Sequence, residues 1–256
     1  MESCTLGTTA PHIILPITMK TSVIIPTYNE ASYIGACIES IMQNGRGMYH
    51  EIIVVDNGCT DNTATVAAAY PGVKVVQELK KGTQNARQRG LMEATGDRIA
   101  FFDGKVRVPE GWFQKAEDIF AKDSRIVSIS GPFRYYDGPR WMRLTMAITW
   151  WLSAPLTYRC VGYMILGGNF MADRKALIDT KAFDAEIRGF GDDTDTARRL
   201  SAAGKVAFHM DFVVYSSMRR FMADGFIKTN VKYALNFLWP VLFKRPFTNT
   251  YDYHVR

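Results

Sequence analysis

Short runs of apolar residues alternate with longer segments of mixed polarity through the first half of the chain. Apolar runs bounded by polar or turn-forming residues are typical of strands buried on both faces of a parallel sheet. We predict such strands at 22–26, 51–56, 73–76 and 98–103. The intervening segments have helical apolar spacing, which predicts helices at 29–43, 60–70 and 83–94. The alternation indicates an α/β fold with a mixed, mainly parallel sheet and helices on both faces.

The second half is less regular. Further strands are predicted at 127–130, 133–136, 165–171, 206–208 and 212–215, and helices at 141–156 and 192–203. Residues 1–18 match no periodic template, and 219–256 read as a basic amphipathic helical tail. We therefore predict a loose extension over 1–18, one domain over 19–218 with halves at 19–110 and 111–218, and the tail.

Composition narrows the classes of protein without choosing one. With 47% hydrophobic and 22% charged residues over 256 positions, the chain is typical of a folded globular protein rather than a disordered one. The net charge of +6 favours anionic partners such as nucleotides, phosphates or a lipid surface, and nothing in the motifs indicates a nucleic acid partner. The four scattered cysteines lack zinc-site spacing and suggest reduced thiols in the cytoplasm.

Polar residues follow three of the first four predicted strands. They are Thr27 to Glu30, Asp56 with Asn57, and Asp103. Ligands bind beyond the carboxyl ends of strands in open parallel sheets, so these residues together indicate one site, although each aspartate alone could cap a turn. The sequence contains neither a GxxxxGK[ST] loop nor a GxGxxG turn, so side chains would have to hold any nucleotide.

An ordered series of motifs resembles family 2 glycosyltransferases with the GT-A (Rossmann-like) fold. The nucleotide-binding half is matched by SVIIPTYNE, EIIVVDNGCTDNT, KKGTQNARQRGLMEATGD and IAFFDGKVRVPEGW. The acceptor half is matched by GGNFMADRKAL, GFGDDTDTARRL and VVYSSMRRF. The resemblance implies an inverting transferase that takes a UDP-sugar or GDP-sugar donor and a hydroxyl acceptor such as a carbohydrate. A lipid-linked acceptor is expected if the chain contacts a membrane.

The same resemblance implies a role for individual residues. Those expected at the nucleotide are Pro26, Thr27, Tyr28, Glu30, Asp56, Arg87 and Asp103. Those expected beside the sugar and acceptor are Gly167, Gly168, Asn169 and Asp195. The paired glycines could equally form a tight bend.

One motif departs from the family pattern. Asp103 matches the first carboxylate of the Asp-x-Asp motif, but Lys105 stands where the metal-ligating aspartate is usual. Three alternatives stay open: a metal-independent transferase in which Lys105 neutralises the diphosphate, Mg²⁺ or Mn²⁺ held differently with Asp103 as the one candidate ligand, or a non-catalytic relative.

A second acidic cluster begins a predicted helix. Asp192, Asp193 and Asp195 are partly explained by helix capping and by the helix dipole. Inverting transfer also needs a base for the acceptor hydroxyl, and the resemblance puts the catalytic aspartate at Asp193. Asp192 replaces the usual glutamate of the family pair, and Asp195 is expected to support the site.

Two aromatic and apolar segments carry basic residues. The predicted helix at 141–156 and the tail after 218 suit either a peripheral position at a membrane interface or core and dimer packing.

Two other functions compete with the transferase: a binding protein that keeps the nucleotide pocket without transfer, and a nucleotidyltransferase. The latter needs a glycine-rich basic loop after the first strand, which Thr27 to Glu30 does not supply.

Overall fold

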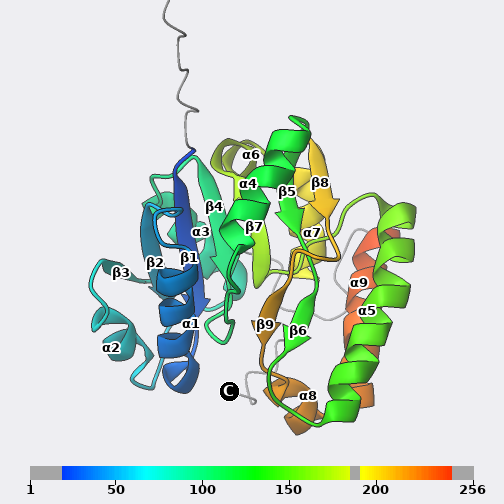
Figure 1. Cartoon of the computed structure of the whole chain (residues 1–256), viewed down its shortest axis with the longest axis horizontal. Coiled ribbons are helices and arrows are strands. Elements are labelled where there is room, and N and C mark those ends of the chain that lie inside the picture. Colours follow the sequence, from blue (N-terminus) through cyan, green and yellow to red (C-terminus); the bar gives the residue numbers. More distant parts are fainter. Residues whose placement is uncertain (1–18, 185–190, 244–256) are drawn as a thin grey trace, which may run out of the picture.

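The computed structural model describes residues 19–184 and 191–243, so the predicted extension 1–18 and the end of the tail, 244–256, lie outside the described residues. Within this part of the chain a seven-stranded sheet has the order β3-β2-β1-β4-β7-β5-β8 (Figure 1). Its strands are β1 (Thr21–Thr27), β2 (Glu51–Asp56), β3 (Val73–Gln77), β4 (Arg98–Phe102), β5 (Ile126–Ser130), β7 (Asn169–Asp173) and β8 (Lys205–Phe208). Only β7 runs antiparallel to its neighbours, which confirms the mixed, mainly parallel sheet.

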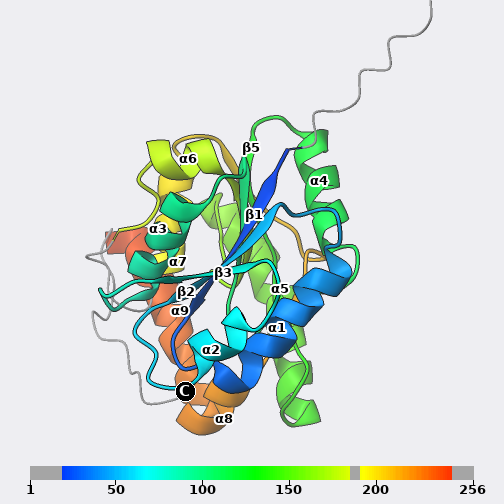
Figure 2. The ribbon, with the colours of Figure 1, turned by 90° about the vertical axis from the view of Figure 1, so that its left-hand side faces the viewer.

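Helices cover both faces of the sheet (Figure 2). One face carries α1 (Ala31–Asn44), α2 (Thr63–Ala68) and α4 (Trp112–Lys122), and the other carries α3 (Thr83–Glu93), α6 (Arg174–Asp179) and α7 (Asp192–Leu200). Alternate side chains of a strand point to opposite faces. Val23 and Ile25 therefore pack in the first layer, whereas Ile24 packs in the second. Both faces of the central strands are apolar for this reason.

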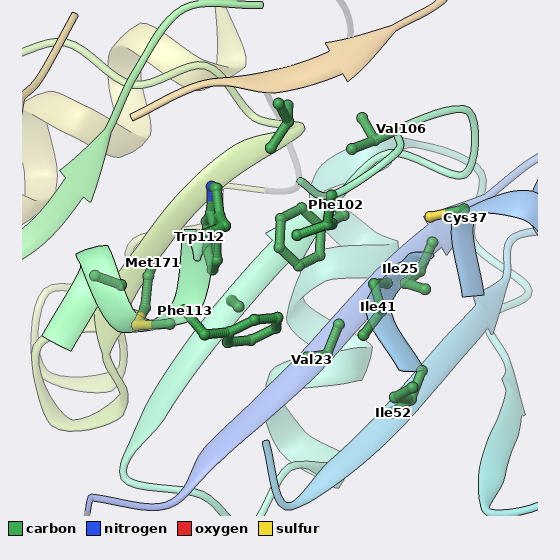
Figure 3. Packing of buried hydrophobic residues seen from close by; sticks show 14 of the residues in the cluster. Val23, Ile25, Cys37, Ile41, Ile52, Phe102, Val106, Trp112, Phe113 and Met171 are labelled. Atoms are coloured by element: carbon green, nitrogen blue, oxygen red, sulfur yellow. The ribbon is translucent and has the colours of Figure 1, made fainter. Parts of the chain in front are cut away.

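An aromatic cluster joins β4 to α4 within the first layer (Figure 3). The rings of Phe102 and Trp112 meet edge to face at 4.7 Å, and Trp112 lies 4.5 Å from Phe212. Fully burying one such side chain stabilises a fold by about 1.5–3 kcal/mol. The end of β4 is thus held firmly just before Asp103.

A smaller layer lies beside the main sheet. It contains the two-stranded sheet of β6 (Phe133–Tyr135) and β9 (Val214–Ser216), with α5 (Arg140–Val161), α8 (Arg219–Asp224) and α9 (Phe226–Phe243). Met146, Met218 and Phe221 form its buried core. The described part of the tail forms two helices, α8 and α9. None of the helices described is long and apolar enough to cross a membrane.

Several predicted boundaries differ from the structure. The strand predicted from 165 begins only at Asn169, because the chain turns at Gly167 and Gly168 and Leu166 bridges back to Asn169. The helix predicted at 60–70 is limited to Thr63–Ala68, and the last predicted strand is Val214–Ser216. Helices α4 and α6 were not predicted from the pattern.

We expect Gly90→Ala to destabilise the protein although alanine is the better helix former. A Cβ at Gly90 would lie 2.4 Å from Ile24 Cγ2 of β1, so α3 would have to move off the sheet. Overpacking of about 1–3 kcal/mol should outweigh the helix-propensity gain of about 1 kcal/mol. Thermal denaturation should show a lower midpoint.

The matched control is Gly35→Ala in α1. There the new Cβ would meet the Tyr70 hydroxyl at 2.8 Å, the far end of a side chain that can rotate away. This variant should be as stable as the wild type or more so. Equal losses in both variants would contradict the close approach of α3 to the sheet.

Candidate active site

The topology brings four chain segments to one edge of the sheet. The parallel strands β1 and β4 end there, at Thr27 and Phe102. The antiparallel β7 begins at the same edge, because Phe102 pairs with Asn169. Gly167 and Gly168 therefore lie beside Asp103, and α7 adds its first turn from the far side.

These segments enclose a cavity of about 460 Å³. Eleven of the fourteen predicted site residues line it, and they come from β1, α3, the β4 end, the β7 start and α7. They are Pro26, Thr27, Tyr28, Glu30, Arg87, Asp103, Lys105, Gly167, Gly168, Asp192 and Asp193. Residues more than 160 positions apart in the sequence thus share one site.

Asp103 and Lys105 form an ion pair in the cavity wall. Lys105 Nζ donates to Asp103 Oδ2 at 2.9 Å. Burial disfavours the charged amine, but the carboxylates of Asp103 and Glu30 outweigh it and raise the pKa of Lys105 above its ordinary value. Lys105 therefore carries a positive charge at neutral pH.

Arg87 joins α3 to the first turn of α7. Its side chain is only 3% exposed, and the guanidinium donates to Asp193 Oδ1 at 2.9 Å and lies 3.5 Å from Asp192 Oδ2. Asp193 Oδ2 accepts the backbone N–H of Gly167 at 2.8 Å. Arginine and glycine thus fix the orientation of the Asp193 carboxylate between them.

The two glycines are required by close approach rather than by a turn type. A Cβ on Gly167 would lie 1.7 Å from Arg87 Nη2 and 2.2 Å from Asp193 Oδ1. A Cβ on Gly168 would lie 2.6 Å from Asp103 Cγ. Any side chain here would displace the charged groups of the cavity.

Asp192 has an unusual environment for a carboxylate. Burial and the neighbouring Asp193 charge raise the pKa of Asp192 well above its ordinary value, and Arg87 only partly offsets them. The two adjacent carboxylates share one guanidinium, that of Arg87.

Three predicted residues do not line the cavity. Asp56 Oδ1 accepts the backbone N–H of Cys59 at 2.7 Å and so closes the turn after β2. Asn169 is fully buried, accepts from the Trp112 indole at 3.0 Å and donates to two backbone carbonyls. Asp195 pairs with Arg198 and Arg199 on α7. All three support the walls from behind.

Asn57, Arg219 and Arg220 also line the cavity: Asn57 was expected at the polar end of the second strand, whereas Arg219 and Arg220 were missed from the sequence. Asn57 accepts from Gly82 N–H at 2.7 Å and donates to the Lys80 carbonyl at 2.8 Å, which fixes the loop before α3. Arg219 donates to Glu30 Oε1 at 2.5 Å, and Arg220 lies beside it in the cavity wall. Both arginines belong to the VVYSSMRRF motif, whose resemblance to the acceptor half of the family is the sequence signal for them.

The described residues do not fit a divalent metal ion. Asp103 is the one predicted candidate ligand, and the Lys105 ammonium is hydrogen-bonded to its Oδ2. Throughout 19–184 and 191–243, no group of three or more His, Cys, Asp or Glu side chains is arranged to hold a metal ion. An ammonium in contact with the carboxylate would repel a divalent cation.

We expect Asp192→Asn to change how folding stability depends on pH. A carboxyl whose folded pKa is raised contributes stability that is present below its unfolded pKa, near 3.8, and lost as pH rises through the folded pKa. Asparagine does not titrate, so the variant's free energy of unfolding should increase relative to wild type from about pH 4 into the neutral range. The gain should exceed about 1.4 kcal/mol, one pKa unit. Urea denaturation across this range measures it.

The control is Asp211→Asn, on an exposed carboxylate whose pKa is lowered mainly by its hydrogen bond to Lys115. Because the folded state lowers the pKa of Asp211, the contribution of this carboxylate to stability is fully present above its unfolded pKa. The free energy of unfolding of this variant should therefore differ from that of wild type by a constant amount over the same pH range. A constant difference for Asp192→Asn would contradict the raised pKa.

Comparison with known proteins places the chain in a family. The sequence model described as Glycosyl transferase family 2 matches residues 22–185. Glycosyltransferase AglE of Haloferax volcanii is 33% identical over 100 residues, 37% of this chain and 33% of the relative. A dolichol-phosphate mannosyltransferase of Pyrococcus furiosus is 38% identical over 96 residues, 36% of this chain and 27% of the relative. The matches thus span about a third or less of these relatives.

Solved structures share the fold at lower identity. A Pyrobaculum calidifontis mannosyltransferase in complex with GDP-Man and Mn²⁺ has a TM-score of 0.66 at 21% identity, over 90% of this chain and 64% of that one. Glucosyl-3-phosphoglycerate synthase of Mycobacterium tuberculosis, with Mn²⁺, UDP and phosphoglyceric acid, has a TM-score of 0.58 at 22% identity, over 89% of this chain and 78% of that one. With the GT-A-like sheet and the family match over most of its length, the chain belongs to glycosyl transferase family 2.

Proposed function

We propose that this protein is an inverting glycosyltransferase that moves a sugar from a nucleoside-diphosphate sugar to a hydroxyl acceptor. The observation that carries the proposal is the single cavity at the ends of β1 and β4. It holds two buried or half-buried cations, Lys105 and Arg87, within reach of the Asp103, Asp192 and Asp193 carboxylates. Such a site can bind an anionic donor and accept a proton from a neutral acceptor.

The donor nucleotide is proposed to lie against Pro26, Thr27, Tyr28 and Glu30. Glu30 Oε2 and Arg87 Nε are buried and have no hydrogen-bond partner among the described residues. Leaving a buried polar atom unpaired costs about 1–3 kcal/mol, so a bound ligand that pairs with them would gain affinity. The solved relatives bind UDP or GDP-mannose, which supports a UDP-sugar or GDP-sugar donor here.

Lys105 is proposed to neutralise the diphosphate in place of a divalent metal ion. As the bond to the sugar breaks, negative charge develops on the departing diphosphate, and a fixed cation lowers the barrier. Lys105 stays charged at neutral pH because Asp103 and Glu30 outweigh its burial and raise its pKa. Arg219 and Arg220 add positive charge to the same wall.

Asp193 is proposed as the base. It takes the proton of the acceptor hydroxyl while that oxygen attacks the anomeric carbon, and the electrons of the broken sugar–phosphate bond leave with the nucleoside diphosphate. Attack from the face opposite the leaving group inverts the anomeric configuration. Arg87 and the Gly167 N–H hold the carboxylate in place.

The location of the protein in the cytoplasm remains a prediction from the cysteine pattern.

One observation favours a second candidate, a nucleotide-sugar-binding relative without transfer. Both oxygens of Asp193 already accept a hydrogen bond, from Arg87 and from Gly167. Each carboxylate oxygen has a second lone pair, so proton transfer remains feasible. Measurements of binding and of turnover separate the two candidates.

We expect wild-type protein to bind one of UDP or GDP in calorimetry equally well with Mn²⁺ and with EDTA. Lys105→Ala should weaken binding by about 10–100-fold, because a charge-assisted hydrogen bond is worth about 1.5–3 kcal/mol. Lys105→Asp should restore the Asp-x-Asp motif and make binding depend on Mn²⁺.

Lys115→Ala serves as the control, since Lys115 pairs with the exposed Asp211 away from the cavity. Its nucleotide affinity should match wild type. Wild-type binding that occurs only with Mn²⁺ would refute the role proposed for Lys105, and no binding under either condition would refute the donor site.

We expect Asp193→Asn to keep nucleotide binding and to lose transfer. Removing a general base slows its reaction by about 10²–10⁴-fold. Turnover is measured with an acceptor found by screening, and NMR of the product reports whether the anomeric configuration is inverted. Asp211→Asn should transfer at the wild-type rate; equal rates for Asp193→Asn and wild type would exclude Asp193 as the base.

A further inference from the structure

Helix α5 exposes an apolar stripe of unusual size. Of the 22 residues in this fully described helix, only Met146 and Ala154 are buried. Six large apolar side chains recur at helical spacing along its outer side and are 48–71% exposed. They are Trp141, Leu144, Ile148, Trp151, Leu152 and Leu156.

Helix α9 continues this exposed surface. Trp141 of α5 packs on Phe226 at the start of α9, with ring centroids 5.3 Å apart, and both helices lie along the same side of the molecule (Figure 1). Ile227, Val231 and Leu235 follow at intervals of four and are 77%, 53% and 38% exposed. We call the exposed apolar residues of α5 and α9 the outer face.

The charges of these two helices have one sign. Arg140, Arg143 and Arg159 belong to α5, and Lys228 and Lys232 to α9, whereas neither helix contains an aspartate or glutamate. Apolar and aromatic residues framed by basic ones are the composition of helices that lie in a membrane interface. The basic residues would be attracted to anionic headgroups.

The inner sides of the same helices line the active-site cavity. Met146, Trp150 and Ala154 of α5 and Tyr233 of α9 form an apolar part of its lining, in the same cavity as Asp103 and Asp193. The Trp150 indole N–H is buried and has no hydrogen-bond acceptor among the described residues. This wall suits the apolar part of an acceptor, with a polar group directed toward the carboxylates.

We propose that the outer face docks on an anionic lipid bilayer, so that the cavity receives an acceptor anchored in that bilayer. The docking stands on the outer face alone, whereas the lipid-linked acceptor rests on the proposed transferase activity. One pair of helices thereby separates the membrane from the reaction site.

Flotation with vesicles of phosphatidylcholine, with and without phosphatidylglycerol, tests the docking on the full chain. Wild type should float with the anionic vesicles and far less with the neutral ones, and added salt should release it. Trp151→Ser combined with Leu152→Ser should lower the partition coefficient at least about tenfold, because bound apolar area sets the affinity. Nucleotide affinity, measured by calorimetry, should not change.

The matched control is Leu79→Ser combined with Met92→Ser, which removes two apolar side chains that are 80% and 69% exposed on other elements. This variant should float like wild type. Equal flotation of the two double variants would overturn the proposal. It would also be overturned if wild type did not bind the vesicles and instead formed a dimer in light scattering that the Trp151→Ser, Leu152→Ser variant did not form. If wild type binds no nucleotide, that result counts against the proposed donor site and does not affect the docking result.

Discussion

The antiparallel pairing of β7 with β4 is the constraint on which the site depends. It sets Phe102 opposite Asn169 and so brings the start of β7 to the edge where the parallel strands end. Trp112 and the carbonyls of Gly131 and Phe212 hold the buried Asn169 side chain, which fixes this register from behind. Gly167 and Gly168 then lie against Arg87, Asp193 and Asp103 with no room for a Cβ. A shift of one residue would turn every side chain of the strand to the other face.

Charge compensation inside the cavity follows from that geometry. Arg87 is held between two carboxylates and Lys105 between Asp103 and Glu30, so each buried cation has an anionic partner. Removing one member of such a pair leaves an uncompensated buried charge, which is far more costly than the pair itself. The same arrangement places the Lys105 ammonium on Oδ2 of Asp103, where its charge opposes the approach of a divalent cation.

The layer of α5, α8 and α9 gives the cavity its asymmetry. One wall is polar and belongs mainly to the main sheet, and the other has apolar side chains from α5 and α9, helices that also expose large apolar side chains to the outside. Contiguous exposed apolar side chains of this kind mark an interaction surface more often than a solvated one. Arg219 of this layer is hydrogen-bonded to Glu30, which follows β1, so a side-chain contact joins the two walls.

The sequence by itself determined the α/β class, the first four strands and the residues of the polar edge, because buried parallel strands form unbroken apolar runs and end in polar turns. Through motif order it also selected Lys105, Arg87 and Asp193, which the structure places in one cavity. Only the tertiary structure decided that Asp56 and Asn169 lie behind the walls, that Arg219 belongs to the cavity, and that β7 starts at Asn169. Local patterns report which face of an element is apolar. They do not report which polar partner, a hundred residues away, a side chain will meet.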